Sequence, residues 1–147
     1  RAVVNFQGPL VFLVVSRYHG GAYVVFSRSL NERVRALALG GSFASVIGGG
    51  AAAAAVFGRE VGARAAADPR IRALRRALGP HPSAEARAAY ERRLEEIRFE
   101  KQAEIAAEFD AIHTVERAHK VGSLERILPA SAMRPTLIAL LEGDAPE

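Results

Sequence analysis

The chain has 147 residues, half of them hydrophobic, which is enough for one globular domain with a core of its own. It has no cysteine, which excludes disulfides, thiolate metal sites and a cysteine nucleophile and fits a reducing compartment such as the cytoplasm. The net charge of +4 comes from arginines interleaved with glutamates, so we expect no nucleic-acid interface.

The N-terminal end of the sequence suggests a piece of something longer. It begins with Arg1 rather than Met, and the first apolar run lacks the flanks of a signal peptide. Residues 36–57 carry no charge and are long enough to span a bilayer. Because Gly, Ala and Ser dominate this stretch, we expect buried core there and no membrane span.

The first half of the chain predicts short strands and one helix. Residues 10–16 are rich in Val, Leu and Phe without polar alternation, as in a strand covered on both faces. Residues 23–30 predict one or two helical turns, and residues 35–39 and 42–47 predict two further strands. Alanine dominates residues 51–66, which predict a single narrow helix packed on the sheet.

The second half is mainly helical. Asp68 and Pro69 predict a helix start, with Asp as N-cap, and that helix should stop at the Gly-Pro-His-Pro of residues 79–82. Residues 83–120 predict one long helix, and residues 131–142 predict a last one. The apolar stripe of the long helix is formed by Tyr90, Leu94, Ile97, Lys101, Ile105, Phe109, Ile112 and Val115.

The expected class is therefore α/β, with a single domain spanning residues 1–147. Within it we expect a sheet core with the Ala-rich helix in residues 1–66. A helical hairpin-like segment follows in residues 67–120, and a closing strand and helix in residues 121–147.

A Gly-Gly pair, Gly20 and Gly21, lies at the centre of residues 11–30, around which we expect the fold to be organised. Glycine permits a sharp turn and close approach of a ligand to the main chain. The free amides where a helix starts favour negative charge, so this corner can hold an oxyanion. The alternative is that the two glycines only turn the chain.

Three blocks of sequence resemble, in the same order, the carboxyltransferase domain of biotin-dependent acyl-CoA carboxylases of the acetyl-CoA and propionyl-CoA type. Arg-Tyr-His-Gly-Gly-Ala-Tyr at residues 17–23 is similar to that family's Arg-Lys-Ala-Tyr-Gly-Gly-Ala-Tyr turn. Ser-Phe-Ala-Ser-Val-Ile-Gly at residues 42–48, with Phe-Gly-Arg-Glu at residues 57–60, resembles its next strand and helix. The closing block comprises residues 115–118, 121–129 and 134–138.

The resemblance implies a crotonase-like (ClpP/crotonase) fold and the C-terminal half of a carboxyltransferase in fatty acid metabolism. In that family this half receives carboxybiotin, while the N-terminal half, absent here, binds acyl-CoA. Implied partners are the N-terminal half, the biotin carboxyl carrier and biotin carboxylase domains, and further copies in a homo-oligomer. The resemblance also implies biotin as the cofactor, carried as carboxybiotin on a carrier domain, and an acyl-CoA as the substrate, and it implies that this half alone would be inactive. We expect no metal site.

Carried over by position, the backbone amides of Gly21 and Ala22 would form the oxyanion hole for the ureido oxygen of biotin. The implied substrate-binding positions are His19, Gly20, Tyr23 and Val24. Val24 falls where the family tunes its acyl pocket. His19 departs from the family pattern, and it is either a proton donor or a hydrogen-bonded turn residue.

Sequence patterns that would point to other functions are weaker than the carboxyltransferase resemblance. Glycines 48–50 before a helix imitate a dinucleotide fingerprint, but the βαβ unit is missing. His113 and His119 lack metal-ligand spacing, and Ser16 and Ser42 lack a nucleophile-elbow context. The arginines of the middle region either meet CoA phosphates or form a solvated face; they are Arg59, Arg64, Arg70, Arg72, Arg75 and Arg76.

Two alternative functions stay open. The chain could be a non-catalytic crotonase-like assembly module that binds a partner along the stripe of residues 90–115. It could also be a subunit of a biotin-dependent acyl-CoA decarboxylase, which uses the same fold and turn.

Overall fold

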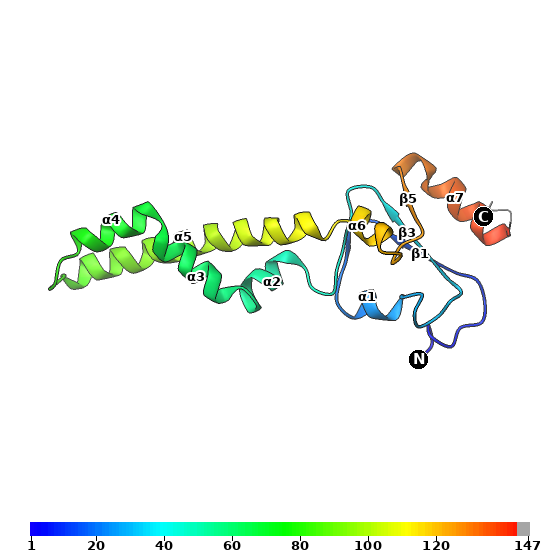
Figure 1. The fold of residues 1–147 in the computed structure, drawn as a ribbon, viewed down its shortest axis with the longest axis horizontal. Coiled ribbons are helices and arrows are strands. Elements are labelled where there is room, and N and C mark those ends of the chain that lie inside the picture. Colours follow the sequence, from blue (N-terminus) through cyan, green and yellow to red (C-terminus); the bar gives the residue numbers. More distant parts are fainter. Residues whose placement is uncertain (144–147) are drawn as a thin grey trace. The chain divides into compact units, whose positions relative to one another are not determined.

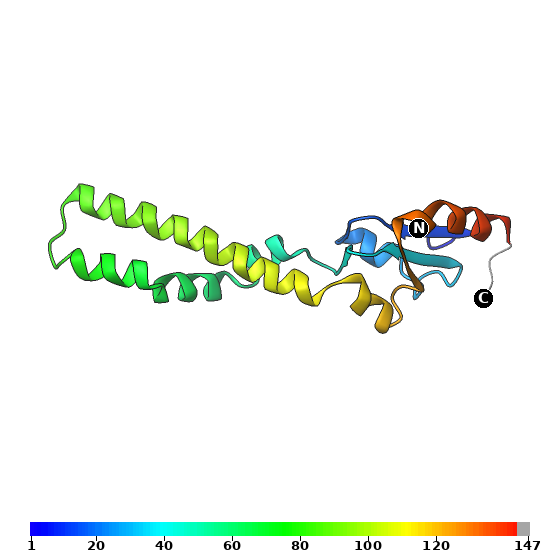
Figure 2. The same cartoon turned by 90° about the horizontal axis from the view of Figure 1, so that it is seen from above.

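A computed structural model describes residues 1–143 and divides the chain into two compact units. The first unit combines Arg1–Gly48 with the segment that starts at Asp110, and the second is Gly49–Phe109. The first unit contains the strands, and the second contains helices and their connections (Figures 1 and 2). Residues 144–147, which end the expected closing segment, lie outside the described residues.

A three-stranded parallel sheet forms the centre of the first unit, in the order β1-β3-β5. The strands are β1 (Leu10–Val14), β3 (Val34–Leu39) and β5 (Arg126–Leu128). Leu10 pairs with Val34 and Val14 with Ala38, while Leu39 pairs with Leu128. Four of the six residues of the central strand β3 are buried. The first strand β1, which the sequence predicts to be covered on both faces, is instead an edge strand in which only Val14 is buried.

A second, two-stranded parallel sheet lies in the same unit. It pairs β2 (Arg17–Tyr18) with β4 (Phe43–Ala44). The helical elements of this unit are α1 (Gly21–Val25), α6 (Val115–Lys120), the 3₁₀ turn η1 (Ala130–Ala132) and α7 (Met133–Glu142). The mixed helix and sheet composition confirms the expected α/β class.

The second unit consists of α2 (Gly49–Ala55), α3 (Gly58–Ala67), α4 (Pro69–Ala77) and most of α5 (Ala84–Ile112). Ile105 of α5 packs in one buried cluster with Ala53 and Val61. Ile97 packs in another with Ala65 and Ile71. Buried residues of the alanine-rich segment thus pack on α5 within the helical unit, whereas the sequence predicts that this segment packs on the sheet.

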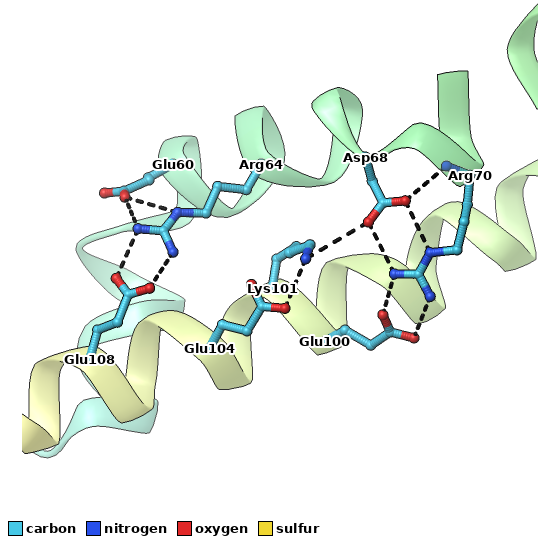
Figure 3. Close-up of polar contacts among 8 residues, drawn as sticks. All are labelled: Glu60, Arg64, Asp68, Arg70, Glu100, Lys101, Glu104 and Glu108. Atoms are coloured by element: carbon cyan, nitrogen blue, oxygen red, sulfur yellow. Dashed lines mark hydrogen bonds and ion pairs between the residues drawn. The ribbon is translucent and has the colours of Figure 1, made fainter. Parts of the chain in front are cut away.

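Charged groups also join α3 to α5 (Figure 3). The Arg64 guanidinium donates to Glu60 one turn earlier and to both carboxylate oxygens of Glu108, at 2.6 and 2.9 Å. The hydrogen bonds that Glu108 accepts from Arg64 lower the pKa of Glu108. The Arg64 guanidinium therefore binds the carboxylates of Glu60 and Glu108, which belong to its own unit.

A second cluster surrounds the N-cap of α4 (Figure 3). As predicted, the Asp68 side chain accepts a hydrogen bond from the Arg70 amide at 2.9 Å, and Pro69 is the first helical residue. The Arg70 guanidinium also donates to Asp68 and to Glu100, and Lys101 lies 3.8 Å from the Asp68 carboxylate. The hydrogen bond from Arg70 is the main reason why the pKa of Asp68 falls to about 2.

Two expected helices are interrupted. The helix predicted at residues 51–66 breaks after Ala55, where the Ala52 carbonyl accepts from the amides of both Val56 and Phe57. Phe57 packs against the cluster around Ile105, and α3 starts only after it. This tertiary contact with α5 ends the first helix although alanine favours its continuation.

The long helix predicted at residues 83–120 ends at Ile112, and α6 follows after a short extended link. The Ala44 amide donates to the His113 carbonyl at 3.0 Å, and the Val115 amide donates to Ser42 at 3.2 Å. Thr114 forms an antiparallel bridge with Phe43. Pairing with β4 therefore takes this backbone out of the helix.

The strand predicted at residues 42–47 is limited to Phe43–Ala44, because the backbone after it turns toward the Gly20 loop. No helix among residues 1–143 is long and apolar enough to cross a membrane.

Candidate functional site

The Gly20–Gly21 corner follows β2 and is held to the end of β4 by backbone hydrogen bonds. The Ser45 amide donates to Tyr18 at 3.1 Å, and the Gly20 amide donates to Val46 at 2.8 Å. Gly20 has a φ of 67°, in the left-handed region that favours glycine. The chain therefore turns sharply at Gly20 and enters α1 at Gly21.

The amides of Gly21 and Ala22 belong to the first turn of α1, where no intrahelical acceptor exists. Within residues 1–143, neither amide has a hydrogen-bond acceptor, and both residues are exposed. Two donors thus stand free in consecutive positions of a turn fixed by its neighbours. Such a pair can bind an oxygen that carries negative charge.

A pocket of about 210 Å³ lies beside this corner. Its lining comes from β1, β2 and the segment between them, together with His19 and Ala22. The structure therefore brings two of the expected site residues to one concave surface.

His19 is tethered within the turn. Its Nδ1 lies 3.0 Å from Ser45 Oγ and 3.2 Å from the Ser45 carbonyl oxygen. The Ser45 hydroxyl donates its own proton to the Ile47 carbonyl at 2.6 Å, so the proton between His19 and Ser45 belongs to Nδ1. The other ring nitrogen, Nε2, is buried without a hydrogen-bond partner among the described residues.

Gly48 makes room for this imidazole. A Cβ atom at position 48 would lie 3.1 Å from His19 Cδ2 and 3.2 Å from Nε2. Ser45 and Gly48 thus fix the histidine, a role that the sequence does not reveal because both residues lie more than twenty positions from it.

An aromatic cluster packs α1 against β1 and β2. The Tyr18 ring lies 4.7 Å from Phe12 and 5.1 Å from Tyr23, and Phe12 stacks on Phe26 at 4.4 Å. The Tyr18 hydroxyl donates to the Tyr23 carbonyl at 3.3 Å, and burial raises the pKa of Tyr18 to about 12. Tyr23 therefore packs inward, while Val24 is 51% exposed.

Two structures of transcarboxylase 12S each match 97% of this chain with a TM-score of 0.55 and 19% sequence identity. The chain has a fold similar to that of transcarboxylase 12S. It spans 22% and 21% of the lengths of the two matched chains, about a fifth.

Transcarboxylase 12S is described as a hexamer that forms a multienzyme core. One of the two structures has methylmalonyl-CoA and methylmalonic acid bound, and the other has hydrolysed methylmalonyl-CoA bound. The sequence itself matches no model of a known protein family and no curated protein. The similarity therefore supports the expected architecture and leaves the chemistry to be argued from the residues.

Proposed function

We propose that this chain is the C-terminal half of a crotonase-like carboxyltransferase in a biotin-dependent acyl-CoA carboxylase. The observation that carries the proposal is the pair of free, exposed amides of Gly21 and Ala22 after the left-handed turn at Gly20. The fold similarity to transcarboxylase 12S and the sequence resemblance of residues 17–23 support it.

The residues at the corner fit the ureido group of biotin. Two adjacent N–H donors match a single carbonyl-type oxygen, and the pocket lined by Ala22 and His19 offers space beside them. When bound, carboxybiotin supplies the carboxyl group and is left with negative charge on its ureido oxygen. The Gly21 and Ala22 amides stabilise that charge, and one such donor contributes about 3 kcal/mol in known oxyanion holes.

His19 has a supporting role in this proposal. Because its Nδ1 proton is engaged by Ser45 and its Nε2 is buried, the ring is not placed to donate a proton to a substrate. It instead joins the turn to the loop after β4. Gly20 supplies the turn, Tyr23 anchors α1, and exposed Val24 faces outward for contact with the acyl group.

The partners follow from the same proposal. The N-terminal half would supply the acyl-CoA site, and a biotin carboxyl carrier and a biotin carboxylase would load and deliver the carboxyl group. We also propose a homo-oligomer, since transcarboxylase 12S is a hexamer. This half alone would have no turnover.

A non-catalytic assembly module along residues 90–115 is less well supported. Ile97 and Ile105, the centre of that stripe, are 0% and 4% exposed because α3 and α4 pack on them within the same unit. A biotin-dependent decarboxylase differs only in the direction of carboxyl transfer. Transfer of the carboxyl group is therefore to be assayed both from carboxybiotin to acyl-CoA and in reverse.

A change at Gly21 tests the proposal in the complete enzyme. Gly21→Pro deletes one N–H at the first helical position, where proline is tolerated, and Gly21→Ala is the matched control, since its Cβ meets no atom within 4 Å. We expect Gly21→Pro to lower kcat about 100-fold or more and Gly21→Ala to leave it nearly unchanged. Full activity in a folded Gly21→Pro enzyme would refute the oxyanion role.

A further inference from the structure

The tip of the α4–α5 hairpin contains a pocket of about 640 Å³. Farther along the hairpin, Ile71 and Ile97 are fully buried and close the seam between the two helices. Toward the tip the helices are joined by a loop, and the small side chains of Ala77, Ala86 and Ala89 leave the space between the helices unfilled. The apolar lining is formed by Leu74, Ala77, Leu78, Ala86, Ala89 and Tyr90.

Basic groups border this apolar space. Arg93 and His81 are part of the lining. Arg93 donates to Glu96 at 2.6 Å, and since a guanidinium has five donors and this one is 40% exposed, it can bind a further acceptor. Residues 74–93, which span the lining, contain five arginines and two glutamates, a net +3 out of the chain's +4.

We propose that this pocket binds a small amphiphilic carboxylate, with its apolar body between α4 and α5 and its carboxylate on Arg93. The volume lies within the range of roughly 300–1,000 Å³ of small-molecule sites, and the lining combines an apolar wall with few polar groups, as such sites do. The site is independent of the carboxyltransferase proposal, because all its residues belong to the helical unit.

Two other occupants fit less well. A second copy of the hairpin would bring another net +3 against the same charge. A partner helix needs a groove along several turns of both helices, whereas α4 contributes only its last residues to this pocket before the loop.

Calorimetric titration of the full chain with decanoate tests the proposal, with decanol as the uncharged probe of equal length. We expect decanoate to saturate at one molecule per chain and decanol to bind far more weakly. Arg93→Gln should weaken decanoate binding about tenfold, because a charge-assisted hydrogen bond is lost. Arg92→Gln, an exposed neighbour outside the lining, is the matched control and should bind like the unchanged chain.

A second variant tests the apolar wall. Ala89→Phe places a ring in the pocket from an exposed helix position, and we expect it to abolish binding while circular dichroism stays unchanged. The proposal is overturned if decanol binds as tightly as decanoate, if Ala89→Phe binds normally, or if the chain shows no saturable binding. If Ala89→Phe does not fold, equal affinity of the two arginine variants still overturns it. Dissociation of an oligomer by Leu74→Asp would also overturn it, since a second copy would then occupy the pocket.

Discussion

Gly48→Ala is predicted to destabilise the first unit through one contact, with the His19 ring. The new Cβ would lie 3.1 and 3.2 Å from two ring atoms, closer than the roughly 3.5–4.0 Å of an ordinary carbon contact. The ring cannot swing away without loss of its hydrogen bonds to Ser45. Overpacking costs about 1–3 kcal/mol, and because the overlap is only a few tenths of an ångström, we expect about 1 kcal/mol.

A double-mutant cycle with His19→Ala isolates this contact. The three atoms nearest to the added Cβ all belong to His19, so Gly48→Ala should cost almost nothing once the ring is removed. Urea unfolding followed by circular dichroism gives the four free energies, and an unchanged m-value shows that only stability has changed. An equal cost of Gly48→Ala in both backgrounds would refute the reasoning.

Two further predictions concern the helical unit. Because hydrogen bonding to Arg70 lowers the pKa of Asp68 to about 2, its carboxylate stabilises the fold above its unfolded pKa of about 3.9, and this stability is lost as the pH falls toward 2. The free energy of unfolding should therefore drop between about pH 4 and pH 2, and Asp68→Asn should flatten that drop; an identical acid profile would contradict the assignment. Ile97→Ala should cost about 2–5 kcal/mol because the side chain is fully buried, whereas Phe99→Ala, at a 64% exposed position of the same helix, should change stability by less than about 0.5 kcal/mol. Equal thermal shifts of these two variants would contradict the observed packing.

The sequence predicts correctly those helix boundaries that depend only on residues near them in the chain. Asp68 and Pro69 start α4 as expected, and the glycine and prolines of residues 79–82 separate it from α5. The breaks before α3 and before α6 could not be predicted, because Phe57 and Thr114 leave the helix to make contacts with residues distant in sequence.

In the candidate site, too, the features set by adjacent residues can be predicted and those set by long-range contacts cannot. The Gly20–Gly21 turn is visible in the sequence because glycine alone tolerates its backbone conformation. The tether of His19 to Ser45 is not visible, since it depends on the parallel pairing of β2 with β4. The pocket at the hairpin tip is likewise a product of helix packing, and its alanines alone carry no signal for it.

The most direct test of the central claim is an amide NMR titration of this chain with biotin. We predict that the amide protons of Gly21 and Ala22 shift downfield in a saturable way, because both are free donors in the present fold. The Gly21→Pro chain should lose the response at Ala22 as well, since the ureido oxygen then lacks its second donor. Shifts confined to other residues, or the same response in the Gly21→Pro chain, would contradict the assignment of this turn as the biotin-binding corner.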